Sequence, residues 1–384
     1  MTDSVKTTIA SIFNDLADGL ETGSFGEKPR IALTGLGSEH GEETTMAAAQ
    51  AAAKAGIEVS YIGQKEAEGV KTVFVEDDEA GHKKMDELLD AGEVDGAVTM
   101  HYPFPIGVST VGRAVTPGKG KEMYLANTTG TSSTDLVEGM VRNAIYGIAV
   151  AKACGNPEPT VGILNLNGAR QVEIILKELS EQGYPIHFAE SARADGGCIM
   201  RGNDVLLGSA DIMVCDSLTG NVISKLLSSF TSGGAYETLG AGYGPGIGED
   251  YRKLIMIISR ASGAPVIENA IRFAADLVHG HIFDVAAQEF ALAKKAGLEE
   301  ILEAHKPKAK EADEEEVTCP PHEVVTAQVP GIEVMDLEDG VKSLWKAGIY
   351  AESGMGCTGP VILVSEANFE KAKALLTQGG YIVS

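Results

Sequence analysis

The sequence predicts an α/β protein: a three-layer, mostly parallel sheet followed by a small C-terminal α+β domain of the split βαβ type. Short runs of Val, Ile and Leu alternate with helical segments along most of the chain, a pattern typical of parallel strands covered by helices on both faces. Hydrophobic residues make up 44% of the 384 residues and aromatic residues only 5%. We therefore expect an aliphatic core of the layered α/β kind rather than a β-sandwich.

Strand and helix patterns follow one another through residues 1–303, which we predict form the large domain. The first helix is predicted over residues 5–20, where apolar side chains recur at helical spacing. An Ala-rich helix is predicted over residues 42–56, ended by Gly56. The further strands are predicted at 31–37, 57–63, 71–76, 95–100, 123–126, 161–164, 211–215 and 254–260, and the further helices near 79–91, 134–153 and 266–278.

The composition changes at residues 304–321, which are charged, contain prolines and lack apolar periodicity. We predict a solvated linker there; a charged surface segment of one continuous domain is the alternative. Beyond it, residues 322–384 follow the order β-α-β-β-α-β, which is the split βαβ motif. Cys357 is expected in the connection between the two middle strands.

The charge balance argues against some classes of partner. The 55 acidic residues outnumber the 31 basic ones, for a formal net charge of −24, which disfavours binding to nucleic acid or to an anionic membrane. The sequence shows no run of 18 apolar residues and no signal peptide, so we expect a cytoplasmic protein. The five cysteines form no CxxC pair, which indicates reduced thiols rather than a disulfide framework.

The strongest candidate site in the large domain is the strand-to-helix turn CDSLTGNVISKLL, residues 215–227. Unpaired backbone N–H groups at a helix N-terminus favour an anion, and Lys225, expected one turn into the helix, could reach back to it. We therefore predict an anion-binding set of Thr219, Gly220, Asn221 and Lys225. The alternative is an ordinary N-cap made by Thr219 or Asn221.

Other strand ends carry further candidates. The hydroxyl-rich turn at residues 126–135 lacks the Walker lysine, so it is not a P-loop. It can be either an anion site or a helix cap made by several residues. Residues 34–43 loosely follow GxGxxG, but acidic residues stand where a pyrophosphate would bind, which argues against a nucleotide. His101 follows the strand predicted at residues 95–100, where a polar side chain can face a ligand; a structural histidine is the alternative.

Paired His and Cys residues do not predict a metal site. His279 and His281 stand two residues apart, and Cys319 and His322 lie close together near the linker. Neither pair has a second half at zinc-ligand spacing. We therefore expect no metal.

Cys357 differs from the other cysteines because glycines surround it, at 354, 356 and 359. Small neighbours allow a large acyl carrier to approach, and consecutive glycine N–H groups can lower a thiol pKa and hold an oxyanion. No His or Lys stands beside Cys357 to act as a base. A catalytic thiol and an inert, exposed thiol therefore both remain open.

Four segments of the chain follow a familiar order: GEVDGAVTM, GNPEPTVGILNLNGA, LLGSADIMVCDSLTGNVISKLL and GAPVIENAIRFA. Together they resemble segments of the phosphate acyltransferases that make acyl phosphate for phospholipid synthesis. The most specific part is the strand-to-helix stretch DSLTGNV…K. The resemblance covers roughly residues 30–280 and implies the fold of phosphotransacetylases and isocitrate dehydrogenase.

The chain departs from that pattern at HYPFPIG, where the lipid enzymes carry a glycine-asparagine loop, and in its tail from about residue 305. Both features, with GMGCTGPVILVS, resemble the alpha subunits of component C of the glycine, sarcosine and betaine reductases. This resemblance implies that Cys357 carries an acetyl group as a thioester. It implies inorganic phosphate as co-substrate, bound near residues 216–225, and acetyl phosphate as product, with no cofactor.

The remaining roles follow from the same resemblance and chemistry. We expect Asp216 to orient Lys225 or a proton-transfer water, and His101 to act as a polarising or basic group. The implied partners are a thiolase-like beta subunit of component C and the selenoprotein component of the reductase, and we expect a homo-oligomer. Two alternatives stay open: a phosphate acyltransferase that uses acyl-carrier-protein thioesters without a catalytic cysteine, and a non-catalytic docking subunit of the same complex.

Overall fold

The chain forms two compact units, residues 1–305 and 306–384. The computed structural model describes Phe13 and residues 28–193, 196–306, 317–332, 336–356 and 359–382. The helix expected over residues 5–20 lies, apart from Phe13, outside the described residues, as do positions 307–316 of the expected linker. No helix in the described part of the chain is both long enough and apolar enough to cross a membrane.

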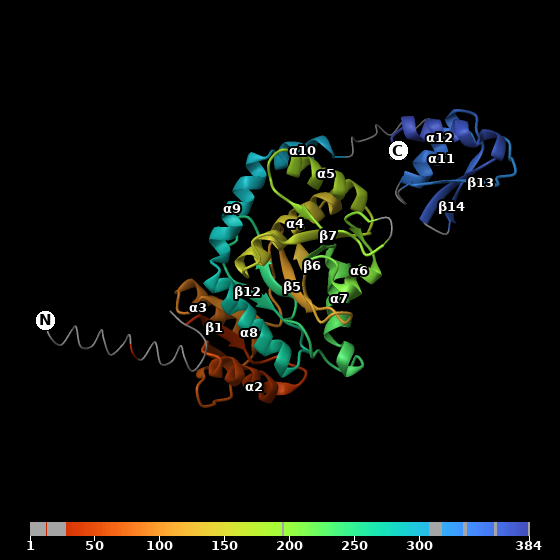
Figure 1. Cartoon of the computed structure of the whole chain (residues 1–384). Helices are drawn as coiled ribbons and strands as arrows, with labels where there is room; N and C mark the ends of the chain where they lie inside the picture. Colours follow the sequence, from red (N-terminus) through yellow and green to blue (C-terminus); the bar gives the residue numbers. More distant parts are fainter. Residues whose placement is uncertain are drawn as a thin grey trace. The chain divides into compact units, whose positions relative to one another are not determined.

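The large unit is built on one sheet of twelve strands (Figure 1). Its order is β3-β2-β1-β4-β12-β11-β5-β6-β10-β7-β8, and β9 pairs with β7. The strands are β1 (Arg30–Thr34), β2 (Glu58–Gly63), β3 (Lys71–Phe74), β4 (Gly96–Thr99), β5 (Val108–Val115), β6 (Glu122–Thr131), β7 (Thr160–Leu164), β8 (His187–Phe188), β9 (Ile199–Met200), β10 (Ile212–Val214), β11 (Gly244–Ile247) and β12 (Ile255–Ile257).

The strands fall into two parallel groups that run in opposite directions. One group contains β1 to β4 and β12, and the other β6 to β10. Between them β11 and β5 make three antiparallel pairings, which reverse the strand direction. The prediction of a mostly parallel α/β sheet is confirmed. Because of the reversal, the carboxyl ends of β1, β4 and β12 lie at one edge, and those of β6, β7 and β10 at the opposite edge.

Part of the turn expected at residues 126–135 is strand instead. β6 runs through residues 126–131 and pairs with β5, where no strand was expected. Their polar side chains are buried because they bond to one another: Thr110 and Thr128 share a hydroxyl contact of 2.6 Å between Oγ1 atoms. A paired hydroxyl can be buried at little cost, so polarity alone did not mark a turn here.

Helices cover both faces of the sheet. Side chains from α2, α4, α5, α8, α9 and α10 share the larger hydrophobic core, while α3 and the pair α6 and α7 contribute to two smaller cores. This gives the expected three layers. The helices are α2 (Gly41–Lys54), α3 (Asp78–Asp90), α4 (Leu136–Ala153), α5 (Ala169–Glu181), α6 (Gly202–Leu207), α7 (Ser217–Ser228), α8 (Ala264–His279), α9 (Ile282–Lys295) and α10 (Leu298–Ala304), with a 3-10 turn η1 (Phe230–Ser232) after α7.

The small unit has its own core around a three-stranded antiparallel sheet. Its described elements are β13 (Ala327–Pro330), α11 (Leu337–Lys346), β14 (Ala351–Gly356), β15 (Gly359–Val364), η3 (Glu366–Asn368) and α12 (Phe369–Gln378). The strand order β13-β15-β14 is that of a split βαβ motif without its last strand. The strand expected at the C-terminus is not formed at Tyr381 and Ile382, and residues 383–384 lie outside the described residues.

A buried carboxylate ties α9 to the body of the large unit. Glu289 of α9 is buried and accepts hydrogen bonds from Lys152 Nζ at 2.7 Å and from the Tyr184 hydroxyl at 2.9 Å. Removing a charge from water is costly unless the charge is paired. Lys152 on α4 and Glu289 on α9 therefore hold the two helices together as one unit.

We predict that Lys152→Met destabilises the chain by about 3–5 kcal/mol, because it leaves the Glu289 carboxylate buried without a counter-charge. The free energy of unfolding in urea measures this loss. The double variant Lys152→Met, Glu289→Gln is expected to recover most of it, since a neutral amide needs no cation. Equal losses for the single and the double variant would contradict this account.

Candidate active site

Helix α7 begins at Asp216, which acts as its N-cap. The Asp216 carboxylate accepts from the backbone N–H of Thr219 at 2.9 Å and from the Thr219 hydroxyl at 2.7 Å. The N–H of Gly220 is already bonded to the Asp216 carbonyl at 2.9 Å. The cap interpretation thus accounts for this turn, although the capping residue is Asp216 rather than Thr219 or Asn221. The anion expected here would meet a carboxylate and N–H groups that are already engaged.

The predicted anion-binding residues are split between the two ends of α7. Lys225 belongs to the last turn of the helix, not one turn in as expected, and lies eight residues after Ser217, about 12 Å along the axis. Asn221 is also engaged, because its Nδ2 donates to the Thr128 carbonyl of β6 at 3.1 Å. The structure therefore does not bring Thr219, Gly220 and Lys225 together.

Gly220 has a packing role in this arrangement. A Cβ atom on Gly220 would lie 1.7 Å from the Asn127 carbonyl oxygen and 2.8 Å from Cys215 Sγ. Only a glycine allows α7 to approach β6 so closely.

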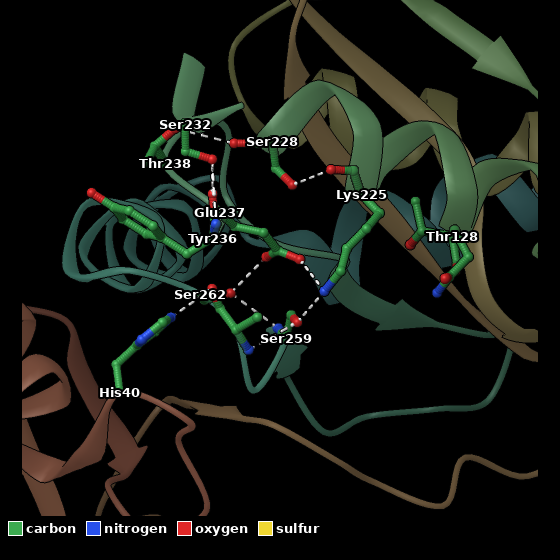
Figure 2. Close-up of polar contacts among 12 residues, drawn as sticks. His40, Thr128, Lys225, Ser228, Ser232, Tyr236, Glu237, Thr238, Ser259 and Ser262 are labelled. Atoms are coloured by element: carbon green, nitrogen blue, oxygen red, sulfur yellow. Dashed lines mark hydrogen bonds and ion pairs between the residues drawn. The ribbon is translucent and has the colours of Figure 1, made fainter. Parts of the chain in front are cut away.

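Lys225 is held by a buried carboxylate and a serine (Figure 2). Its Nζ lies 2.8 Å from Glu237 Oε1 and donates to Ser259 Oγ at 2.7 Å. The Glu237 side chain is 2% exposed, whereas that of Lys225 is 44% exposed. The buried Glu237 carboxylate thus fixes the Lys225 ammonium, which stays partly exposed to solvent. The expectation that Asp216 orients Lys225 is wrong, because Glu237 has that position.

The ionisation of this group is set by opposing effects. Burial alone would lower the pKa of Lys225, but its hydrogen bond to Glu237 and the charge of that carboxylate outweigh burial and raise the pKa above its ordinary value. Burial, and then the charge of Glu237, raise the pKa of the neighbouring Tyr243 phenol. At neutral pH, Lys225 is therefore a cation and Tyr243 a neutral hydroxyl, so neither is suited to act as a base.

The turn after β12 is hydrogen-bonded to Glu237, the partner of Lys225. Ser262 Oγ donates to Glu237 Oε2 at 2.8 Å and accepts from the backbone N–H of Ser259 at 3.1 Å. The backbones also interlock, because the N–H of Glu237 donates to the Ala261 carbonyl at 3.1 Å and the Gly263 N–H donates to the Glu237 carbonyl at 2.9 Å. The loop that carries Glu237 and the turn that carries Ser259 are thus one hydrogen-bonded unit.

Two further basic side chains border this turn. His40 Nε2 lies 3.3 Å from the Ala261 carbonyl, and its ring stands edge-on to that of Tyr236, as Figure 2 shows. The Arg260 guanidinium lies 3.9 Å from an Asp78 oxygen and stays more than half exposed. Basic groups of Lys225, His40 and Arg260 and the carboxylates of Glu237 and Asp78 thus lie together at the edge of the sheet where β1, β4 and β12 end.

His101 lies at the end of β4, at that same edge. Its backbone carbonyl is 2.9 Å from His82 Nε2, which also lies 3.0 Å from the Thr99 hydroxyl. The His101 residue itself is exposed. His101 thus lies at the same edge of the sheet as Lys225, and its role as a polarising or basic group remains a prediction.

The described cysteines of the large unit are buried or half-buried, which disfavours their thiolate forms. Burial raises the pKa of Cys215 to about 12 and those of Cys154 and Cys198 to about 11. Cys319 is exposed. Cys357 lies outside the described residues, between Gly356 and Gly359, the last register pair of β14 and β15. Within the described part of the chain, no cluster of His, Cys, Asp and Glu could hold a metal ion.

Sequence reasoning missed Glu237, Ser259, Ser262 and His40. Ser259 could have been found, because it ends the strand pattern LIMIISR and strand ends carry ligands in such sheets. Glu237 had no such signal, since it stands in the irregular segment SGGAYETLG between two elements. Its importance comes from burial, which the sequence does not display.

Comparisons with known proteins identify the class of this chain. It matches the family described as “Fatty acid synthesis protein” over residues 29–363. A phosphate acyltransferase from Thermus thermophilus is 26% identical over 236 residues, 51% of this chain and 70% of that protein. Among solved structures, a branched-chain phosphotransacylase from Enterococcus faecalis V583 has a TM-score of 0.46 and 17% identity, covering 65% of this chain and 99% of that one. The EutD phosphotransacetylase from Staphylococcus aureus has a TM-score of 0.43 and 13% identity, covering 70% and 98%.

The chain therefore belongs to the Fatty acid synthesis protein family. The matched residues run from the start of β1 into β15. The glycine/sarcosine/betaine reductase complex component C subunit alpha of Peptoclostridium acidaminophilum is 57% identical to it over 381 residues, 98% of this chain and 99% of that protein. Within the broader family, the chain belongs with these component C alpha subunits.

We predict that Gly220→Ala destabilises the chain by at least about 2 kcal/mol, because α7 must move away from the Asn127 carbonyl to make room for a methyl group. Urea unfolding measures this loss. Gly202→Ala is the matched control: a Cβ at Gly202 meets nothing within 4 Å, so a change close to zero is expected. If both variants unfold at the wild-type urea concentration, the close approach of α7 to β6 does not exist.

Proposed function

We propose that this chain is an acyltransferase subunit that holds an acetyl group as a thioester on Cys357 and transfers it to inorganic phosphate, within a glycine/sarcosine/betaine reductase complex. Membership among the component C alpha subunits supports the assignment to that complex. The single observation that supports the phosphate site is the Lys225 ammonium, fixed by buried Glu237 and by Ser259 where β12 ends.

The proposed reaction balances without a further reagent. An oxygen of hydrogen phosphate attacks the thioester carbonyl carbon, a C–O bond forms and the C–S bond breaks. The phosphate proton passes to the departing sulfur, so the products are acetyl phosphate and the free Cys357 thiol. The energy of the thioester is retained in the acyl phosphate, whereas hydrolysis would waste it, so the site must favour phosphate over water.

The Lys225 site has the properties that phosphate binding requires. Its ammonium is a cation that stays 44% exposed while Glu237, Ser259 and the Tyr243 phenol fix its position. Arg260 adds a second cation from the same turn. Glu237 partly neutralises Lys225, as Asp78 does Arg260, so we assign the main contact with phosphate to Lys225 because its position is fixed. This replaces the set expected at the N-terminus of α7.

We predict that Lys225→Gln lowers kcat/KM for phosphate by about 10²-fold or more, because one charged donor at the reacting anion is lost. Acetyl phosphate formation by the assembled reductase, followed against phosphate concentration, measures the effect. Lys177→Gln is the matched control, because Lys177 also pairs with a carboxylate, that of Glu173, at 2.8 Å, but lies on α5. A wild-type kcat/KM for Lys225→Gln would show that phosphate does not bind at this site.

We predict that Cys357 becomes acetylated when the chain is incubated with acetyl phosphate, and that Cys357→Ala abolishes both the label and acetyl phosphate formation. Peptide mass spectrometry locates the acetyl group. Cys319→Ala is the control, because Cys319 is an exposed thiol of the described chain. An acyltransferase that uses carrier-protein thioesters would keep its activity in Cys357→Ala, and a docking subunit would show no phosphate-dependent acetyl exchange even as wild type.

A further inference from the structure

His82 of α3 contacts the chain through both nitrogens of its ring. Its Nδ1 lies 2.9 Å from the Asp78 backbone carbonyl, one turn earlier in the same helix. Its Nε2 lies 2.9 Å from the backbone carbonyl of His101, the second residue after β4, whose own ring is exposed. The His82 side chain is 25% exposed, so solvent can reach the ring. These two contacts tie α3 to the beginning of the loop that carries His101.

The two contacts together constrain the protonation state of His82. A backbone carbonyl can only accept a hydrogen bond, and a neutral imidazole carries a hydrogen on one nitrogen alone. The neutral ring can therefore donate to Asp78 or to His101, but not to both. The imidazolium carries a hydrogen on each nitrogen and can donate to both carbonyls at once. The full set of contacts thus belongs to the charged ring.

The Thr99 hydroxyl provides for the neutral ring. It lies 3.0 Å from His82 Nε2 and accepts from the Thr34 hydroxyl at 2.9 Å. With Thr34 as its donor, the Thr99 hydroxyl can direct its own hydrogen to an unprotonated Nε2. That arrangement satisfies the ring and leaves the His101 carbonyl without the N–H donor of His82. In the charged state the same hydroxyl can turn to the His101 carbonyl, which lies 3.5 Å away. Loss of the proton on Nε2 therefore releases the start of the loop, while Nδ1 stays bonded to Asp78.

His82 shares the Asp78 carboxylate with Arg260. Asp78 Oδ1 lies 3.8 Å from His82 Nδ1, and Asp78 Oδ2 lies 3.9 Å from the Arg260 guanidinium. One turn further along α3, the Asp86 carboxylate is already paired with Lys253, at 3.3 Å. A charged His82 offsets part of the Asp78 charge and so leaves Arg260 a stronger attraction for an anion.

We propose that His82 is a positioning residue whose imidazolium fixes the His101 backbone at the end of β4 and strengthens the charge of Arg260. Three elements meet at this ring, because α3 carries it, the end of β4 faces Nε2, and the turn after β12 brings Arg260 to Asp78. The contact with the loop is independent of the acetyl-transfer chemistry. Its consequence for phosphate rests on the proposed function.

Two measurements on the full wild-type chain test the contact. Nitrogen NMR of the histidine rings follows the protonation of His82, whose signal is the one missing from His82→Gln. Amide hydrogen exchange, corrected for the direct effect of pH, follows residues 102–107. As pH rises through the range of histidine titration, about 5 to 8, we expect the ring to lose its proton from Nε2 and the loop to lose protection with the same midpoint. Protection independent of pH, a different midpoint, or loss of the proton from Nδ1 would overturn the proposal.

Three variants make the exchange measurement specific. His82→Gln cannot change its charge, so the protection of residues 102–107 is expected to become independent of pH. His305→Gln is the matched control and is expected to keep the wild-type pH dependence. His305 is also 25% exposed and has both ring nitrogens in contacts of 2.8 Å, to side chains of α5. Asp78→Asn removes the shared carboxylate, so the loop is expected to lose protection at a lower pH than in the wild type. A pH dependence that persists in His82→Gln, or an unchanged midpoint in Asp78→Asn, would contradict the proposal.

Phosphate kinetics test the consequence for the site. The ratio of kcat/KM for phosphate between the wild type and His82→Gln, measured at each pH on the assembled reductase, cancels the titration of phosphate itself. This ratio is expected to fall by up to about fivefold as pH rises, the size of effect for one partly exposed charge pair. A ratio that does not change with pH would overturn the link between His82 and phosphate. Failure of the proposed function is distinguishable, because it would appear as a wild-type kcat/KM for Lys225→Gln.

Discussion

The buried carboxylate of Glu237 is the constraint on which the candidate site depends. A buried carboxylate costs several kcal/mol unless a cation and hydrogen-bond donors satisfy it. Lys225 supplies the cation and Ser262 a donor, from two elements that are remote in sequence. The end of α7, the loop before β11 and the turn after β12 must therefore be in place together. Glu237, rather than the N-terminus of α7, determines where the Lys225 ammonium lies.

Much of the fold could be predicted from the sequence because its strands are aliphatic and its helices periodic. The reversal of strand direction could not, because it depends on β11 and β5. β11 reads GPGI, which resembles a turn, and β5 carries Ser109 and Thr110, whose hydroxyls are satisfied only by long-range partners. Lys225 was expected one turn into its helix, whereas the structure places it in the last turn of α7. Periodicity predicts that a helix exists. The capping contacts of Asp216 and the pairing of Lys225 with Glu237 are known only from the folded structure.

The composition of α7 connects its packing to its outer face. The inner contact with β6 leaves no room for a side chain at Gly220, so this face contributes little apolar burial of its own. Asn221 and the Asp216 cap hold the helix by hydrogen bonds instead. Leu227 is the large apolar side chain that α7 buries in the core, and Ile223 packs against the same cluster. Leu218, Val222 and Leu226 stay exposed on the outer face.

Exclusion of water would change the physics of the Lys225 site without moving the lysine. The helix is fixed by its cap, by Asn221 and by the Glu237 pair. The amount of water can change on the exposed flank of the ammonium. Excluding water lowers the local dielectric and strengthens the attraction between a cation and phosphate. It also removes the nucleophile that competes with phosphate for a thioester. Covering that flank would therefore favour phosphorolysis over hydrolysis through solvent exclusion alone.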